Sequence, residues 1–152
     1  MTDASPGRVL ALDVGDRRIG VALSDATGVI AQPLTTLHRG KRPEADLDAL
    51  AALIGEHGVT TLVVGWPLRL DGRPTPQTRK VERFTAALEQ RTGLVAERWD
   101  ERLSTVAAER ALLEGNVRRA QRKQVVDKVA ATLILQGFLD ARAWRARRAD
   151  DD

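Results

Sequence analysis

The chain has 152 residues, a length typical of one compact domain, and its 43% of hydrophobic residues is enough for a single core. The absence of cysteine excludes a disulfide framework, a thiolate metal site and a cysteine nucleophile. A formal net charge of +3 permits nucleic acid as a partner without requiring it, and no apolar run approaches the roughly 18 residues of a membrane span.

The first half of the chain predicts three strands followed by a helix. Short apolar segments at 8–14, 18–24 and about 29–38 are separated by the turn-like sequences "GDRR" and "SDATG". Strands joined by such short turns predict an antiparallel meander. The apolar residues that follow Pro43 have the spacing of one helix face: Leu47, Leu50, Leu53 and Ile54.

The second half alternates strands and helices. The segment "VTTLVVGWPL" (59–68) is a near-continuous apolar run, typical of a strand buried on both faces. A loop rich in glycine and proline follows, and then a helix that ends at Gly93. A fifth strand is expected over 94–101, a helix after its N-cap candidate Ser104, and a last helix over about 122–147.

The resulting order βββαβαβαα predicts an α/β fold. Its five-stranded mixed sheet has three antiparallel strands, then strands joined by crossovers, and helices flank the sheet. We expect a single domain over 1–152, with flexible tails at 1–7 and 148–152. The N-terminus has no basic segment followed by an apolar one, so we expect a cytoplasmic protein without membrane contact.

One aspartate interrupts the apolar pattern of the first strand. Strand alternation places Asp13 on the same face as Val9 and Ala11, where a half-buried sheet favours an apolar residue. A carboxylate there lowers stability unless a positive group meets it. The alternative is that Asp13 simply begins the turn before Gly15.

Two further acids occupy comparable positions. Glu101 stands at the end of the predicted fifth strand, and Asp127 in the first turns of the last helix. Because crossovers bring strand ends together, one site at the edge of the sheet can gather both with Asp13. Alternatively, Glu101 pairs with Arg102 or stays solvated, and Asp127 complements the dipole of its helix.

A cluster of these acids requires positive charge. Carboxylates within about 4 Å repel by something like 4 kcal/mol at an effective dielectric near 20. His38 and His57 are the only histidines and lie in neither acidic segment, so the ligands would be oxygen atoms. Oxygen ligands suit Mg²⁺ or Mn²⁺, and two such ions about 3.5–4 Å apart can activate water and stabilise the departing oxygen of a phosphodiester.

The sequence resembles the YqgF/RuvX group, Holliday junction resolvase-like proteins that are also described as candidate pre-16S rRNA nucleases. The segments that carry the resemblance run in order from residue 10 to residue 140: "LALDVGDRRIGVALSD", "LVVGWPLRLDGRPTPQTRKVERF", "DERLST" and "VDKVAATLILQGFLD". The resemblance implies a ribonuclease-H-like fold. It also implies a site in which Asp13, Glu101 and Asp127 are the catalytic, metal-binding acids. Trp66 departs from the family pattern, in which a smaller aliphatic residue is expected.

Contacts to nucleic acid are expected from the turn after the first strand, the loop "LRLDGRPTPQT" and the basic segment before the last helix. The candidates are Arg17, Arg18, Gln77, Arg79, Arg118, Arg119, Arg122, Lys123 and Lys128. The alternatives are a solvated basic face and a plain connecting loop. Aromatic residues make up only 3% of the chain, so we expect recognition of backbone and shape more than of bases.

The expected function is a metal-dependent endonuclease that acts on structured nucleic acid. The resemblance favours RNA, in 5′-end processing of pre-16S rRNA during ribosome biogenesis, by a monomer or homodimer. One alternative is a Holliday junction resolvase, which would act on branched DNA as a two-fold dimer. Another is a nucleic-acid-binding factor without turnover. A sugar kinase or actin-like ATPase fragment is a weaker alternative, because 152 residues leave no room for two domains around a nucleotide.

Overall fold

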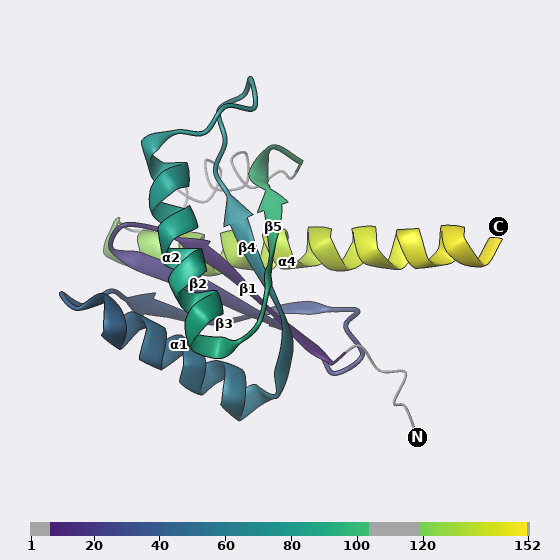
Figure 1. The fold of residues 1–152 in the computed structure, drawn as a ribbon, viewed down its shortest axis with the longest axis horizontal. Helices are drawn as coiled ribbons and strands as arrows, with labels where there is room; N and C mark the ends of the chain where they lie inside the picture. Colours follow the sequence, from purple (N-terminus) through teal and green to yellow (C-terminus); the bar gives the residue numbers. More distant parts are fainter. Residues whose placement is uncertain (1–6, 104–118, 152) are drawn as a thin grey trace.

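A computed structural model describes residues 7–103 and 119–151, and the side chains of 7–103 and 129–150. Figure 1 shows the course of the chain. Its elements are β1 (Arg8–Val14), β2 (Arg18–Ser24), β3 (Ala31–His38), α1 (Pro43–His57), β4 (Val59–Trp66), α2 (Pro76–Thr92), β5 (Ala96–Asp100), the 3₁₀ turn η1 (Glu101–Leu103) and α4 (Arg119–Asp151).

The five strands form one mixed sheet in the order β3-β2-β1-β4-β5. β1 pairs antiparallel with β2, and β2 with β3, whereas β1 with β4 and β4 with β5 are parallel. The predicted antiparallel meander followed by parallel crossovers is therefore confirmed.

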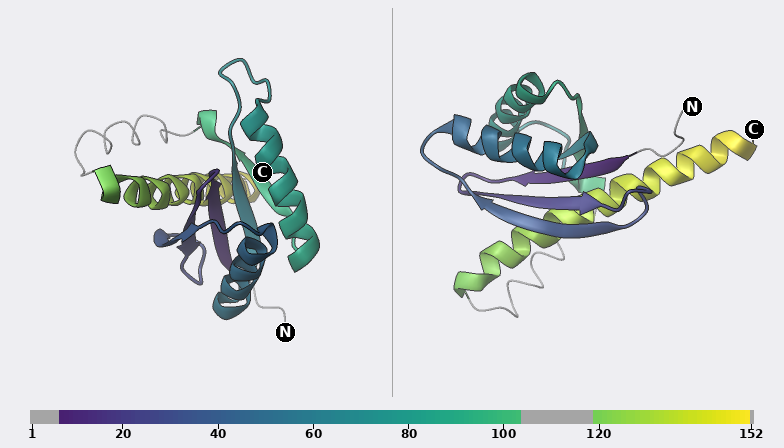
Figure 2. Two further views of the ribbon diagram at one scale, coloured as in Figure 1. Left: turned by 90° about the vertical axis from the view of Figure 1, so that its left-hand side faces the viewer. Right: turned by 90° about the horizontal axis from the view of Figure 1, so that it is seen from below.

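Helices cover the two faces of this sheet unequally. α1 and α2 lie on one face and the long helix α4 on the other, as the right-hand view in Figure 2 shows. The alternation predicted for β1 holds, because Leu10, Leu12 and Val14 belong to the core under α1 and α2. Val9 and Ala11 belong to a second core under α4.

Four elements differ in their bounds from the sequence expectation. β4 ends at Trp66 instead of residue 68, and β5 covers Ala96–Asp100 instead of 94–101. β3 begins at Ala31 instead of about residue 29, because the Asp25 carboxylate accepts hydrogen bonds from the backbone N–H groups of Val29 and Ile30, both at 2.8 Å. These bonds close a turn before the strand can pair, and with the hydroxyl of Thr27 they hold the pKa of Asp25 well below its usual range. α4 begins at Arg119 and continues to Asp151, so residues 148–151 are helical.

The helix expected after Ser104 lies outside the described residues. In the part of the chain that the structure describes, no helix has the length and apolar character needed to cross a membrane.

Candidate active site

Two of the three predicted acids line one small pocket. Asp13 and Glu101 share a cavity of about 250 Å³ with Gly65, Pro67 and Gln77, among others. Asp13 is the sixth residue of β1, and Glu101 directly follows β5 as the first residue of η1. Both residues are partly exposed to solvent.

The topology of the sheet explains this convergence. β1, β4 and β5 are parallel neighbours, so their carboxyl ends lie at the same edge. Asp13 is on the α4 face of β1, as Ala11 is, and β4 lies between Asp13 and Glu101. Any side chain that projects from β4 toward α4 at this level would therefore stand between the two acids.

Gly65 occupies that level of β4. A Cβ atom at this position would lie 2.7 Å from Oε1 of Glu101 and 2.7 Å from Cδ1 of Ile134, closer than side-chain contacts allow. The absence of a side chain lets the Glu101 carboxylate lie against the strand and lets α4 approach. The sequence analysis missed Gly65, although a glycine within an apolar strand is a signal of close approach.

The turn after Asp13 is fixed by hydrogen bonds from three directions. The Gly15 N–H donates to the carbonyl of Arg18 at 2.9 Å. Nη1 of Arg39 donates to the carbonyl of Gly15 at 2.9 Å, and Nε2 of Gln77 donates to the carbonyl of Val14 at 3.4 Å. The backbone next to Asp13 is thereby tied to α2 and to Arg39, the residue that directly follows β3, which limits the positions that the Asp13 carboxylate can take.

Asp127, the third predicted acid, lies within the helical span of α4, but its side chain is outside the described part of the structure. In sequence it precedes Ile134 by seven residues, about two helical turns. Among the described residues, no three histidine, aspartate or glutamate side chains gather as a metal site. The grouping of Asp127 with Asp13 and Glu101 therefore stays a prediction.

Asp100, the neighbour of Glu101 in sequence, is paired with Arg102. Its carboxylate binds the guanidinium of Arg102, with Nη2 to Oδ2 at 2.6 Å, and accepts the Arg102 backbone N–H at 2.9 Å. These bonds hold the pKa of Asp100 below its usual value. The guanidinium of Arg102 is bound to Asp100 and to the carbonyl of Leu70.

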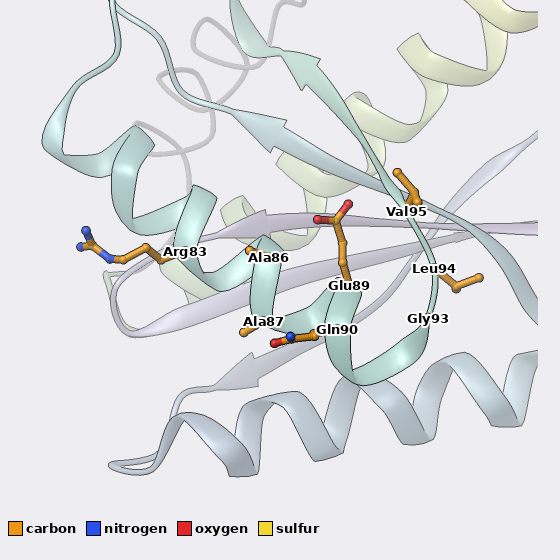
Figure 3. A pocket seen from close by; sticks show the side chains of 8 residues that line it. All are labelled: Arg83, Ala86, Ala87, Glu89, Gln90, Gly93, Leu94 and Val95. Carbon is orange, nitrogen blue, oxygen red and sulfur yellow. The ribbon is translucent and has the colours of Figure 1, made fainter.

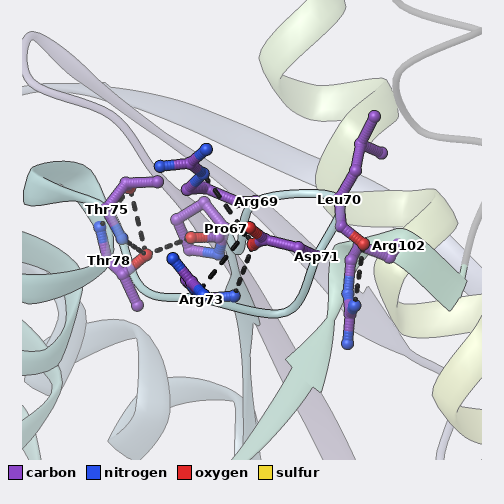
Figure 4. Close-up of polar contacts among 8 residues, drawn as sticks. All are labelled: Pro67, Arg69, Leu70, Asp71, Arg73, Thr75, Thr78 and Arg102. Carbon is purple, nitrogen blue, oxygen red and sulfur yellow. Dashed lines mark hydrogen bonds and ion pairs between the residues drawn. The ribbon is translucent and has the colours of Figure 1, made fainter.

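The loop between β4 and α2 borders the pocket at Pro67 and is held by its own hydrogen bonds (Figure 4). The Arg69 N–H donates to the carbonyl of Arg73 at 2.9 Å, which folds the loop into a short hairpin. Thr75 and Thr78 form a reciprocal cap on α2, and the Thr78 hydroxyl donates to the carbonyl of Pro67. The cap places the first turn of α2, with Gln77, beside the acids.

The predicted nucleic-acid contacts fall into three groups. Gln77 lines the acidic pocket, and Arg79 is exposed on the same helix. Arg17 and Arg18 line a separate basic cleft. The side chains of the third group lie outside the described residues: Arg118, Arg119, Arg122, Lys123 and Lys128.

Trp66 does not reach the acids. It packs against the core under α1 and α2, and the Arg98 guanidinium lies 5.0 Å from the centre of its ring. Trp66 therefore lies on the face of the sheet opposite the acidic pocket.

A larger hollow of about 850 Å³ lies between α2 and the segment that leads into β5 (Figure 3). Its carboxylate, Glu89, accepts the Ala96 N–H at 2.8 Å and lies 3.5 Å from the guanidinium of Arg98. The carboxylate of this hollow is thus bound to the backbone of β5 and lies next to Arg98, whereas the smaller pocket holds two of the acids that the sequence predicts.

The sheet order and the flanking helices define the fold class, which is ribonuclease-H-like. The chain is similar to the solved structure of RuvC from T. thermophilus in complex with a Holliday junction substrate, with a TM-score of 0.54 and 11% identity. The match covers 90% of this chain and 96% of that one. A second RuvC structure from Thermus thermophilus, with a TM-score of 0.51 and 12% identity, has the same coverage.

Sequence comparison identifies the family. The RuvX family model, described as Holliday junction resolvase, matches residues 7–141. A candidate pre-16S rRNA nuclease from Myxococcus xanthus is 51% identical over 134 residues, which is 88% of both chains. One from Clostridium novyi is 49% identical over 134 residues, 88% of this chain and 98% of that one. The chain belongs to the RuvX family, as its motifs indicate, and is a nuclease.

Proposed function

We propose that the chain is a metal-dependent endonuclease that hydrolyses phosphodiester bonds in structured nucleic acid, with the 5′ end of pre-16S rRNA as its substrate. The observation that carries this proposal is the shared pocket of Asp13 and Glu101, two acids 88 positions apart in sequence, behind a glycine that leaves room for one of them. The RNA substrate is supported by the names of the curated relatives. Such a substrate would place the protein in the cytoplasm. The protein would act there as a monomer or a homodimer.

The residues of the pocket fit a hard divalent cation. The donors are carboxylate oxygens, the ligand type that Mg²⁺ and Mn²⁺ prefer, and histidine lines no part of the described pocket. Asp13 and Glu101 would hold the metal, and Asp127 would complete the ligand set from α4. A bound divalent ion supplies charge stabilisation at the phosphoryl group and lowers the pKa of water.

The chain's own groups have separate tasks. The glycine at position 65 leaves the space in which the Glu101 carboxylate sits. Gln77 fixes the backbone of Val14 through its amide, and this holds Asp13 in place. The basic side chains that the sequence analysis named would bind phosphates on either side of the reacting bond, which fixes the register of the substrate without reading its sequence.

Asp13→Asn tests the proposal. The amide keeps the shape of the side chain and removes its charge, so we expect cleavage to fall by about 10³-fold, equivalent to several kcal/mol of lost charge stabilisation. Parent and variant would be compared on a labelled RNA with a 5′ extension in Mg²⁺, with circular dichroism to show that the fold is kept. The matched control is Asp48→Asn, whose exposed carboxylate binds Arg91 away from the pocket; it should cleave like the parent. Equal cleavage by Asp13→Asn and the parent would refute the assignment.

A Holliday junction is the second candidate substrate, favoured by the description of the matching family model. Cutting a junction symmetrically requires a two-fold dimer with two sites. Sedimentation, together with cleavage of a four-way DNA junction and of the precursor RNA, separates the two substrates. A third outcome is that the parent and Asp13→Asn bind RNA equally well and the parent cleaves neither substrate. In that case the chain is a binding factor without turnover.

A further inference from the structure

A second, basic cleft of about 640 Å³ lies beside the acidic pocket. Its walls come from the β1–β2 turn, the connection from β3 to α1, and α2. The turn and the start of α1 lie at the same end of the molecule, toward the left of Figure 1. The basic side chains that line it are Arg17, Arg18, Arg39, Lys41 and Lys80, with His38 at the same wall.

The charge of this cleft is strongly positive. Two carboxylates, Asp16 and Asp46, stand against five arginine and lysine side chains. Asp46 is bound to Arg39 at 3.1 Å, and Asp16 lies 3.4 Å from Nζ of Lys80. The lining therefore carries an excess of three positive charges. Within residues 7–103 and 129–150, Arg17 and Lys41 form no ion pair, and both are exposed.

Arg39 makes the cleft a fixed part of the fold. Its guanidinium binds the buried carboxylate of Asp46, donates to the carbonyl of Gly15, and lies 4.9 Å from the centre of the Phe84 ring. Its backbone N–H donates to the carbonyl of Arg17 at 2.8 Å. The turn that presents Arg17 is thereby held by the same residue that fixes the backbone after Asp13.

Both the basic cleft and the acidic pocket share lining residues with a third hollow. A hollow of about 320 Å³ shares Asp16, Arg39 and Lys80 with the basic cleft, and it shares Val14 and Gln77 with the acidic pocket. The Cα atoms of Asp13 and Asp16 are three residues apart, at most about 11 Å even for an extended chain. That distance corresponds to about three base pairs along the axis of a duplex, where each strand carries one charge per roughly 3.4 Å of axis.

We propose that the basic cleft binds the phosphodiester backbone of a nucleic-acid strand a few nucleotides from the bond at the acidic pocket. The ligand chemistry is phosphate, because the lining offers guanidinium and ammonium groups and the ring of Phe84 nearby is covered by Arg39. The part of this inference that places the cleaved bond at the acidic pocket rests on the proposed function. The binding of a strand in the basic cleft is independent of it, because binding requires neither Asp13 nor a metal.

Binding without turnover tests the cleft. A labelled single-stranded RNA and a four-way DNA junction would be titrated, in EDTA, with the parent and with the double variant Arg17→Gln/Lys41→Gln. The matched control is Arg145→Gln/Arg147→Gln, which removes the same charge from exposed positions on α4. At 0.1 M salt the cleft variant should bind RNA on the order of 20-fold more weakly, and the salt dependence of log Kd should fall by about 1.4, for two lost phosphate contacts. The α4 control should match the parent.

Comparison of the single-stranded RNA with the DNA junction shows which kind of nucleic acid the cleft accepts. Weaker binding of either one by the cleft variant supports the proposal. If the cleft variant binds both as tightly as the parent, or if the α4 control loses as much affinity, the proposal is overturned. The result is independent of the nuclease assignment. If the parent binds nucleic acid but does not cleave it, and the cleft variant does not bind, the proposed function is refuted. The proposal that the basic cleft binds nucleic acid is then retained.

Discussion

The two faces of the sheet are built from different residues and serve different ends. Under α1 and α2 the core consists mainly of large aliphatic side chains, such as Leu12 and Leu62, which are fully buried. Under α4 it is made partly of alanines, including Ala11, Ala130 and Ala131. Small residues let the helix lie close to the strands, and the acids Asp13 and Glu101 follow where this second core ends.

If the proposed function is correct, one short strand contributes to both stability and chemistry. β4 contributes Leu62 to the aliphatic core and, three residues later, Gly65 to the acidic pocket. Successive side chains of a strand point to opposite faces, so a substitution on one face should alter stability and one on the other should alter cleavage. Two substitutions in β4 test this division.

Leu62→Ala should have the largest effect on stability. The side chain is fully buried between large neighbours, so its loss should lower the free energy of unfolding by about 2–5 kcal/mol. Because it lies on the face away from the acids, cleavage per folded molecule should match the parent. Urea denaturation and an activity assay at a temperature where both proteins are folded give the two values. A tenfold loss of activity in the folded variant would contradict the division between the faces.

Gly65→Ala should have a smaller effect on stability and a specific effect on cleavage. The new methyl group would meet Glu101 and Ile134, so we expect a loss of about 1–3 kcal/mol in stability from overpacking. Displacement of the Glu101 carboxylate should lower cleavage about 10- to 100-fold, since misplaced catalytic groups act poorly. Both are measured as for Leu62→Ala.

The control for this change is Gly55→Ala. A Cβ atom at Gly55, within α1, would meet nothing within 4 Å. Alanine favours a helix over glycine, so this variant should gain up to about 1 kcal/mol and cleave normally. A Gly65→Ala protein that behaved in the same way would show that the pocket tolerates a side chain there.

Asp100→Asn should have the smallest effect and should depend on pH. The Arg102 guanidinium holds the pKa of Asp100 below its usual value, so the pair contributes stability above that value and loses it as the pH falls through the folded-state pKa. The pair is partly exposed, with 36% of the Arg102 side chain accessible, and we expect less than about 1 kcal/mol at pH 7. Urea denaturation at pH 7, 5 and 3 should show the difference between parent and variant shrinking toward zero. A difference that stayed constant over this range would exclude the ion pair as its cause.

The elements and their faces could be predicted because their signals are local. The period-2 pattern of β1, the glycine that ends α2 and the short turns between the first strands all lie within a few residues of one another. The acids Asp13 and Glu101 could be named from the interruption of a strand and from the family motifs. The position of Asp127 relative to them stays a prediction.

The sequence by itself determined the strands, the helices and the alternation that gives β1 an aliphatic face and an acidic one, because such patterns depend only on near neighbours in the chain. Only the tertiary structure decided that β4 lies between Asp13 and Glu101 with a glycine at their level, and that Arg17, Arg39 and Lys80 line one cleft. Those contacts join residues that are distant in sequence. They arise from the order of strands in the sheet and from the packing of α2 and α4 on its faces, which no local pattern encodes.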